Sequence, residues 1–309
     1  MGHLTKVINN LNVFDATHFS YVASSNPTEG GYNFETNHAF FPLFPYLVHN
    51  IGRLVGDESL LYVNLCFQLL VSYLNTVLIY RVGILIFQKA RVAEIAAYLY
   101  IFSHSMVYQM SFYSENTFLF FSLVGMLVLY SGTGSETHGR RDWKVPTTAK
   151  VLCAALSWGM CTFTRSTGVV HSLFIAFFMG NKIILEANRC CKLFAYVMVC
   201  LLTIVIMFVP LWTVMYWRPY LTHCETRMDR TSQVPLWCLD AVPNVYPYIQ
   251  DVYWDNGFLA FLDRPLDRLA TSLPMNFILF YIVYRVLVEQ PVSMLSLSLF
   301  SSDVPKTQR

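Results

Sequence analysis

The sequence predicts an all-α, polytopic membrane protein in which a bundle of spanning helices carries longer loops. Of its 309 residues, 55% are hydrophobic and only 13% are charged, a balance outside that of ordinary soluble domains. One uncharged stretch, Leu193 to Trp217, is 25 residues long. As a helix rising about 1.5 Å per residue, it exceeds a hydrocarbon core of about 30 Å. The third observation is the uneven distribution of Lys and Arg between apolar stretches.

Seven apolar stretches are predicted to span the membrane. Six lie within residues 60–217 and the seventh covers residues 271–288. The spans run from Leu60 to Phe87, Val92 to Met110, Thr117 to Ser131, Lys150 to Arg165, Thr167 to Asn181, Leu193 to Trp217 and Thr271 to Val288. They leave a first loop of residues 1–59, a second loop of residues 218–270 and a tail of residues 289–309.

The orientation follows from the short connections, because Lys and Arg there stay on the cytoplasmic side. Three alternate connections hold ten such residues, whereas the tips between them hold only Arg165. The ten are Arg81, Lys89, Arg91, Arg140, Arg141, Lys144, Lys150, Lys182, Arg189 and Lys192. Both loops are therefore predicted to be lumenal and the tail cytoplasmic. Because Met1 to Phe14 lacks the features of a secretory signal, we expect longer relatives to carry an additional first helix.

The net charge and the cysteine spacing argue against nucleic-acid binding and against a zinc site. The net charge is +2, without a basic patch interleaved with aromatic residues, so nucleic acid is not an expected partner. No cysteine spacing is typical of zinc sites. No cluster of acids resembles a metal cage either, so we expect no metal requirement. Cys224 and Cys238 share one polar segment. A disulfide between them is compatible with a lumenal position, but the sequence leaves their pairing open.

The first loop ends in a predicted amphipathic helix. After Pro45, apolar residues recur at helical spacing from Leu47 to Val55, and polar residues take the other face. The stretch is too short to span, so we expect an interfacial helix beneath the loop. An ordinary helix packed on the bundle is the alternative.

Two polar helix tips indicate a site. Val151 to Thr164 and Ser166 to Gly180 are uncharged arms of 14 and 15 residues, which favours a hairpin with Arg165 at its tip over a single helix. The preceding tip contains Glu115 and lies on the same predicted side. Ionisable residues at membrane depth are costly unless they face protein or water. The alternative is that Glu115 and Arg165 only mark helix ends.

Asp15 and His18 lie in the first loop, one helical turn apart. On the residues alone, Asp15 is more typical of a helix N-cap than of a catalytic acid.

Five blocks of the sequence, in order, resemble the PIG-V family, the GPI mannosyltransferase 2 group. They are Asp15 to Phe19, Phe40 to Pro45, Tyr113 to Glu115, Arg165 to Gly168, and Trp237-Cys238 leading into Tyr246 to Leu259. The last block is the most specific, and the resemblance extends over about Phe14 to Pro274.

The resemblance implies a GT-C-like helical bundle in the endoplasmic-reticulum membrane with a lumenal active site. It implies an inverting enzyme that transfers the second mannose, in α-1,6 linkage, from dolichyl-phosphate mannose to a GPI-anchor precursor. The lipid-linked donor is a substrate, so no cofactor is expected. The matching position for the base in the first lumenal loop is Asp15, whose carboxylate would accept the acceptor hydroxyl's proton.

Six further residues are candidates for substrate binding. A guanidinium stabilises a leaving phosphate better than a flexible ammonium does, which makes Arg165 the candidate for that role. Glu115 would orient Arg165 or bind sugar. His18 and His38 would bind phosphate or acceptor hydroxyls, although loop histidines are more often structural. Tyr253 and Trp254 belong to an aromatic segment that forms either a sugar-stacking wall or, as we favour, a packing surface.

Two other readings stay open. The chain could be a truncated, non-catalytic isoform or partner of the same pathway, and the resemblance leaves open a small membrane partner subunit. A small-solute transporter is the third reading, but the sequence lacks the paired halves of many carriers.

Overall fold

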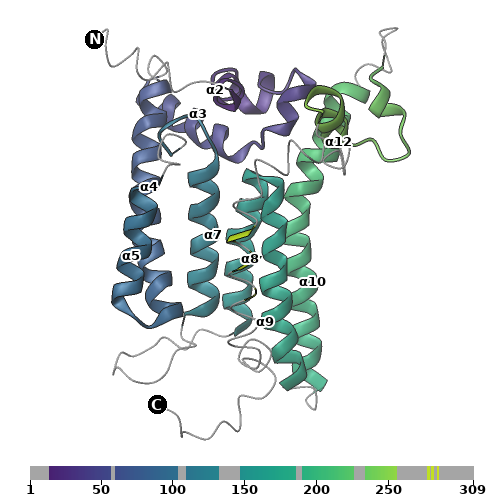
Figure 1. Cartoon of the computed structure of the whole chain (residues 1–309). Coiled ribbons are helices and arrows are strands. Elements are labelled where there is room, and N and C mark those ends of the chain that lie inside the picture. Colours follow the sequence, from purple (N-terminus) through teal and green to yellow (C-terminus); the bar gives the residue numbers. More distant parts are fainter. Residues whose placement is uncertain are drawn as a thin grey trace, which may run out of the picture.

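The computed structural model describes residues 14–56, 60–103, 109–131, 147–185, 190–225 and 234–255, together with residues 277, 278, 280, 281 and 284. Within these residues the regular structure is helical throughout, which confirms the all-α prediction. Figure 1 shows an upright bundle of long helices, with shorter helical segments across one end.

The bundle packs its helices in sequence, with α10 returning to cover α8. α4 contacts α5 and α7, α7 contacts α8, and α10 contacts both α8 and α9. The helices are α4 (Leu60–Phe87), α5 (Ala90–Ile101), α7 (Glu115–Tyr130), α8 (Thr147–Thr164), α9 (Ser172–Leu185) and α10 (Cys190–Trp212). A 3₁₀ turn, η4 (Ser166–His171), joins α8 to α9, so the chain reverses at Arg165 as the sequence predicts.

Among the described residues, two helical stretches are long and apolar enough to cross a membrane: Leu60–Phe87 and Leu193–Glu225. The second continues α10 through the π-helical turns η5 (Thr213–Trp217) and η6 (Tyr220–Glu225). The expected span from Val92 to Met110 is wrong in extent, because α5 ends at Ile101 after 12 residues. The expected span 271–288 lies largely outside the described residues. The seven-span topology stays a prediction.

Close contact between α8 and α10 depends on a glycine and a proline. Pro210 lies inside α10 and has no backbone N–H, so the carbonyl of Ile206, four residues earlier, loses its helical donor. Gly159 faces that carbonyl, and a Cβ atom there would lie 2.9 Å from the Ile206 oxygen. Around this contact Trp158, Cys161 and Met207 are fully buried in the main apolar core.

A first capping segment lies across one end of the bundle. It contains α2 (Asp15–Ser24), the π-helical turn η1 (Asn26–Gly30), the 3₁₀ turn η2 (Glu35–Ala39) and α3 (Leu43–Val55). α3 is the expected amphipathic helix. It begins earlier than expected, at Leu43, and buries Phe44 and Val48 against the bundle while Leu54 stays exposed.

A second capping segment lies beside the first. It contains η7 (Leu236–Leu239), α12 (Val245–Tyr248) and the π-helical turn η8 (Ile249–Tyr253), and both α12 and η8 contact η2. Cys224 and Cys238 are joined by a disulfide, which settles the pairing that the sequence left open. The bonded cysteines pack with Trp237, Val245 and Ile249 in a small buried core.

Candidate functional site

A cavity of about 260 Å³ lies where both capping segments meet the ends of α7 and α8. Its walls combine charged, polar and aromatic side chains. The polar lining includes Asp15, Ser114, Glu115, Arg165, Ser166 and Gln250, and the aromatic lining consists of Phe19, Phe40, Phe41, Tyr113, Tyr246 and Trp254. The cavity therefore unites residues from all five blocks of the sequence resemblance, although the Trp237-Cys238 part of the last block is not in its lining.

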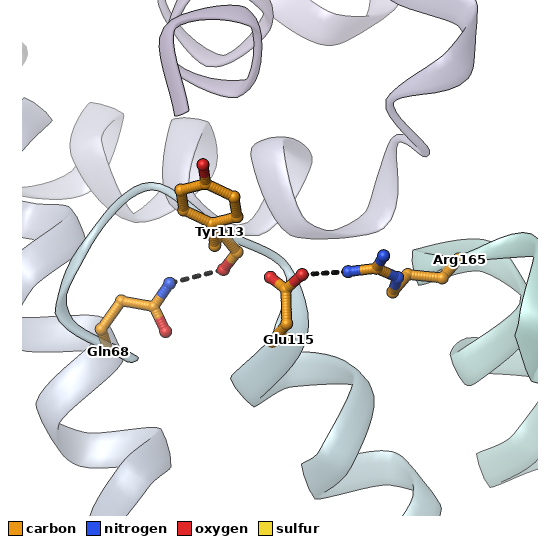
Figure 2. Close-up of polar contacts among 4 residues, drawn as sticks. All are labelled: Gln68, Tyr113, Glu115 and Arg165. Atoms are coloured by element: carbon orange, nitrogen blue, oxygen red, sulfur yellow. Dashed lines mark hydrogen bonds and ion pairs between the residues drawn. The ribbon is translucent and has the colours of Figure 1, made fainter. Parts of the chain in front are cut away.

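Glu115 and Arg165 form an ion pair in this cavity, with Arg165 Nη1 donating to Glu115 Oε1 (Figure 2). Each side chain is 43% exposed. Ion pairs this accessible to water contribute only about 0–1 kcal/mol to stability. The pair therefore places two opposite charges in the cavity without making a large contribution to folding.

The turn that carries Arg165 is built from close backbone packing. Arg165 is extended, with φ −154° and ψ 144°, after α8 ends at Thr164. Gly168 lies against the last turn of α8, where an added Cβ would come within 2.2 Å of the Thr162 nitrogen. His171 Nδ1 donates to the Gly168 carbonyl at 2.9 Å, and its Nε2 accepts from Ser122 Oγ at 2.7 Å. These contacts fix the tip relative to α7.

Asp15 is the first residue of α2 and lines the same cavity as Arg165. The N-cap interpretation is wrong, because Phe14 holds the N-cap position and makes no side-chain capping bond. Phe14 has φ 53°, an uncommon conformation for a bulky residue. The Asp15 side chain is exposed and has no polar partner within the described part of the chain. Its carboxylate is thus free to meet a bound molecule.

Two polar atoms at the cavity wall have unmet hydrogen-bonding capacity. Glu115 Oε2 and Ser114 Oγ are buried and have no hydrogen-bond partner in the described structure. Buried polar atoms without a partner are uncommon and require an explanation. Ser114 was missed as an individual site residue, although its position in the polar tip before Glu115 was a usable signal.

The other candidates divide between the cavity and its surroundings. Trp254 lines the cavity and meets Phe40 edge-on, with ring centroids 5.9 Å apart. Tyr253 lies outside the lining and contacts Glu35 Oε2 at 3.4 Å. The aromatic segment thus both packs and contributes to the wall. Gln250 and Tyr246, which reach the cavity from the same segment, were not predicted individually.

The two histidines do not reach the cavity lining. His18 stacks on Phe40 at 4.6 Å between ring centroids and lies 3.3 Å from Asn37 Oδ1. His38 is 1% exposed and pairs with His223. Both therefore support the wall. No group of three or more potential metal ligands occurs among the residues that the structure describes, and the absence of a metal requirement stays a prediction.

These features define a class of protein: a helical protein with membrane-length apolar helices and a charged, aromatic-walled cavity beneath two capping segments. A family model described as Mannosyltransferase (PIG-V) matches residues 2–309. The chain belongs to this family.

Curated relatives carry matching names. The chain is 27% identical to the GPI alpha-1,6-mannosyltransferase 2 of Cricetulus griseus, with 97% of the chain aligned to 63% of the relative. It is 26% identical to the Homo sapiens protein of the same name, over 97% of the chain and 62% of the relative. The Drosophila melanogaster GPI mannosyltransferase 2 is also 26% identical, over 88% and 63%. The chain thus spans about three-fifths of these relatives' length. No solved structure matches it significantly.

Proposed function

We propose that this protein is a mannosyltransferase of GPI-anchor assembly, acting at the lumenal face of the endoplasmic-reticulum membrane. It transfers mannose in α-1,6 linkage from dolichyl-phosphate mannose to a GPI precursor. The observation that carries the proposal is that Asp15, Glu115 and Arg165 line one cavity, within a chain whose relatives are named as GPI mannosyltransferases.

Asp15 is the proposed general base. A sugar hydroxyl is a weak nucleophile near neutral pH, and a carboxylate that accepts its proton in the transition state raises the rate by a factor of about 10² to 10⁴. The deprotonating oxygen attacks the mannose anomeric carbon as the bond from that carbon to the phosphate oxygen breaks. One displacement inverts the anomeric configuration.

Arg165 is the proposed partner of the leaving group. The departing dolichyl phosphate takes the electron pair of the broken bond, so its negative charge grows along the reaction. A preorganised guanidinium stabilises that charge more than it stabilises the substrate. Glu115 holds the guanidinium through the ion pair.

The test is complementation of cells that lack GPI mannosyltransferase 2. Wild-type chain and Asp15→Asn are compared at equal membrane abundance, with surface GPI-anchored proteins as the readout. We expect Asp15→Asn to abolish restoration and Arg165→Ala to reduce it strongly. Glu35→Gln is the matched control, because Glu35 is an acid of the same capping segment that lies outside the cavity lining. Full restoration by Asp15→Asn would contradict the role of Asp15.

A transfer assay in membranes distinguishes an enzyme from a non-catalytic partner or isoform of this pathway. Mannose transfer from radiolabelled dolichyl-phosphate mannose, measured in membranes that contain this chain as the sole form, is expected if the chain is an enzyme. Restoration that occurs only beside a longer form, without transfer by the chain itself, would favour the partner or isoform reading. The small membrane partner subunit remains a prediction, since the relatives' names refer to the transferase alone.

A further inference from the structure

Glu115 enters the cavity from an irregular turn that precedes α7. Residues 111–114 do not continue a helix, and α7 begins at Glu115 with Ser114 as its N-cap, without a side-chain capping bond. The turn thus presents backbone carbonyl groups that no helical ladder satisfies. Inside an apolar bundle such groups need other donors. The position of Glu115 depends on what supplies them.

Gln68 of α4 supplies two of these donors. Its side-chain Nε2 donates to the carbonyl of Ser111 at 3.0 Å and to that of Tyr113 at 2.7 Å. Figure 2 shows the Gln68 amide directed at the Tyr113 carbonyl, with Glu115 and its Arg165 partner on the far side of the turn. Gln68 has no exposed surface.

Asn116, the residue after Glu115, closes the network. Its Nδ2 donates to Gln68 Oε1 at 3.1 Å and to the Gln109 carbonyl at 2.9 Å. Asn75, two turns further along α4, donates to the Asn116 carbonyl at 3.0 Å. Gln68 therefore uses both its donor hydrogens and its oxygen to bind the chain on both sides of Glu115.

We propose that Gln68 is a positioning residue: it fixes the turn that presents Glu115 to Arg165, and through this pair it sets the Arg165 guanidinium for transfer. Gln68 does not line the cavity, so it acts through Glu115 and touches no substrate. The kinetic part rests on the proposed function. The geometric part, the dependence of the Glu115 to Arg165 spacing on Gln68, does not.

The effect of losing Gln68 follows from its surroundings. Without the amide, the Ser111 carbonyl keeps the Tyr113 N–H at 2.8 Å, but the Tyr113 carbonyl loses the Gln68 donor and Asn116 loses the Gln68 oxygen. The turn is then no longer tied to α4 on both sides of Glu115. A misplacement of about 1 Å at a reacting group can lower the rate about 100-fold. Because Arg165 is proposed to act mainly in the transition state, we expect Gln68→Met to lower kcat at least tenfold, with a smaller change in KM.

The matched control is Asn64→Leu. Asn64 lies one turn before Gln68 on α4, is 3% exposed, and its Oδ1 accepts no hydrogen bond within the described structure. Asn64→Leu makes the same kind of amide-to-apolar change on the same helix. We expect it to retain wild-type kcat. Gln68→Glu keeps the shape but provides at most one donor where the amide provides two, so it should also lower kcat.

A crosslinking yield tests the geometric part of the proposal and does not require that the protein be active. Glu115→Cys and Arg165→Cys are combined in the full chain, with the free cysteines replaced, and joined by a short bifunctional thiol reagent. We expect Gln68→Met to lower the crosslinking yield severalfold and Asn64→Leu to leave it unchanged. Equal yields in the Gln68→Met and parent chains would overturn the proposal.

A double-mutant cycle adds the kinetic test. If Gln68 acts through Arg165, then Gln68→Met lowers kcat in the wild type but adds little to Arg165→Ala. Independent, multiplicative losses would overturn the positioning role, because they are the result of a general structural defect. A reduced crosslinking yield in a chain whose wild type transfers no mannose would support the geometry and count against the proposed function.

Discussion

The Nε2 atoms of His38 and His223 lie 3.1 Å apart, and this contact joins the first capping segment to the helix that leads into the second. Both rings are buried. Arg218, one turn before His223, binds the Pro27 carbonyl and lies 4.3 Å over the Tyr32 ring. These polar contacts therefore join the first capping segment to the end of the long helix that leads into the second, and both segments supply residues to the cavity lining.

The histidine contact predicts a loss of stability in mild acid. Burial, followed by the nearby His223 and Arg218, lowers the pKa of His38 from its ordinary 6.5 to about 3. The folded ring stays neutral, whereas the unfolded ring takes a proton near pH 6.5. The stabilising contribution of the neutral ring is therefore complete above pH 6.5 and is lost progressively as pH falls toward 3.

Thermal unfolding of the detergent-solubilised protein at several pH values measures this effect. Between about pH 7.5 and 5, His38→Gln should flatten the fall in the unfolding midpoint, since one proton-linked group has been removed. His49→Gln is the control, because His49 is in the same capping segment, is only partly buried and hydrogen-bonds to the Ala23 carbonyl. An unchanged pH dependence in His38→Gln would show that this ring does not control the acid response.

The disulfide predicts that the stability of the protein also depends on reductant. Cys224 and Cys238 are 14 residues apart, and closing a loop of about 15 residues stabilises a fold by about 3 kcal/mol in the chain-entropy description. Reduction should lower the unfolding midpoint and loosen the wall that carries Tyr246 and Trp254. Cys153→Ser, which removes an exposed free cysteine, should retain the full response. The double variant Cys224→Ser with Cys238→Ser should start lower and ignore reductant.

The sequence predicted the parts of the site that depend on helix ends. Arg165 and Glu115 were each recognised as polar tips between apolar arms, and their ion pair follows from the two tips lying at the same end of the bundle. The length of one apolar stretch predicted α4 with its bounds, and helical spacing predicted the amphipathic α3. These features are local, because they depend on runs and spacings of neighbouring residues.

What the sequence could not predict depends on distant contacts. His38 pairs with a residue 185 positions away, so no local pattern distinguished this structural histidine from a phosphate ligand. Gln68 is one polar residue in a long apolar helix and was not singled out from the sequence, because its role depends on a turn 43 to 45 positions later. The early end of α5 likewise contradicts an apolar run that continues beyond Ile101.

Trp254 and its neighbour Tyr253 differ in their position relative to the cavity, which allows a matched comparison. Trp254 lines the cavity, whereas Tyr253 is half exposed and contacts Glu35 outside it. An aromatic contact is worth about 0.5–1.5 kcal/mol beyond the buried area. Under the proposed function, Trp254→Ala should raise KM for the lipid-linked substrates roughly fivefold, and Trp254→Phe should recover part of it. Tyr253→Ala serves as control, and an equal rise in its KM would argue against a specific role for Trp254.

Gly168 offers a steric test of the turn that carries Arg165. A Cβ at Gly168 would lie 2.2 Å from the Thr162 nitrogen and 2.4 Å from the Cys161 carbonyl carbon. Both are backbone atoms of α8, so neither can yield as a flexible side chain would. In Gly168→Ala the turn must therefore move away from α8, and Arg165 moves with it relative to Glu115.

We expect Gly168→Ala to destabilise the fold by about 1–3 kcal/mol, as overpacking does, and to lower mannose transfer at temperatures where the protein stays folded. Gly180→Ala is the matched control, because nothing lies within 4 Å of a Cβ there and alanine favours the helix by about 1 kcal/mol. Unfolding midpoints and transfer rates measured side by side distinguish the two effects. If Gly168→Ala folds and transfers as well as Gly180→Ala does, the turn tolerates a displacement that the Glu115 to Arg165 pairing should not allow, and the tight coupling of tip geometry to catalysis is wrong.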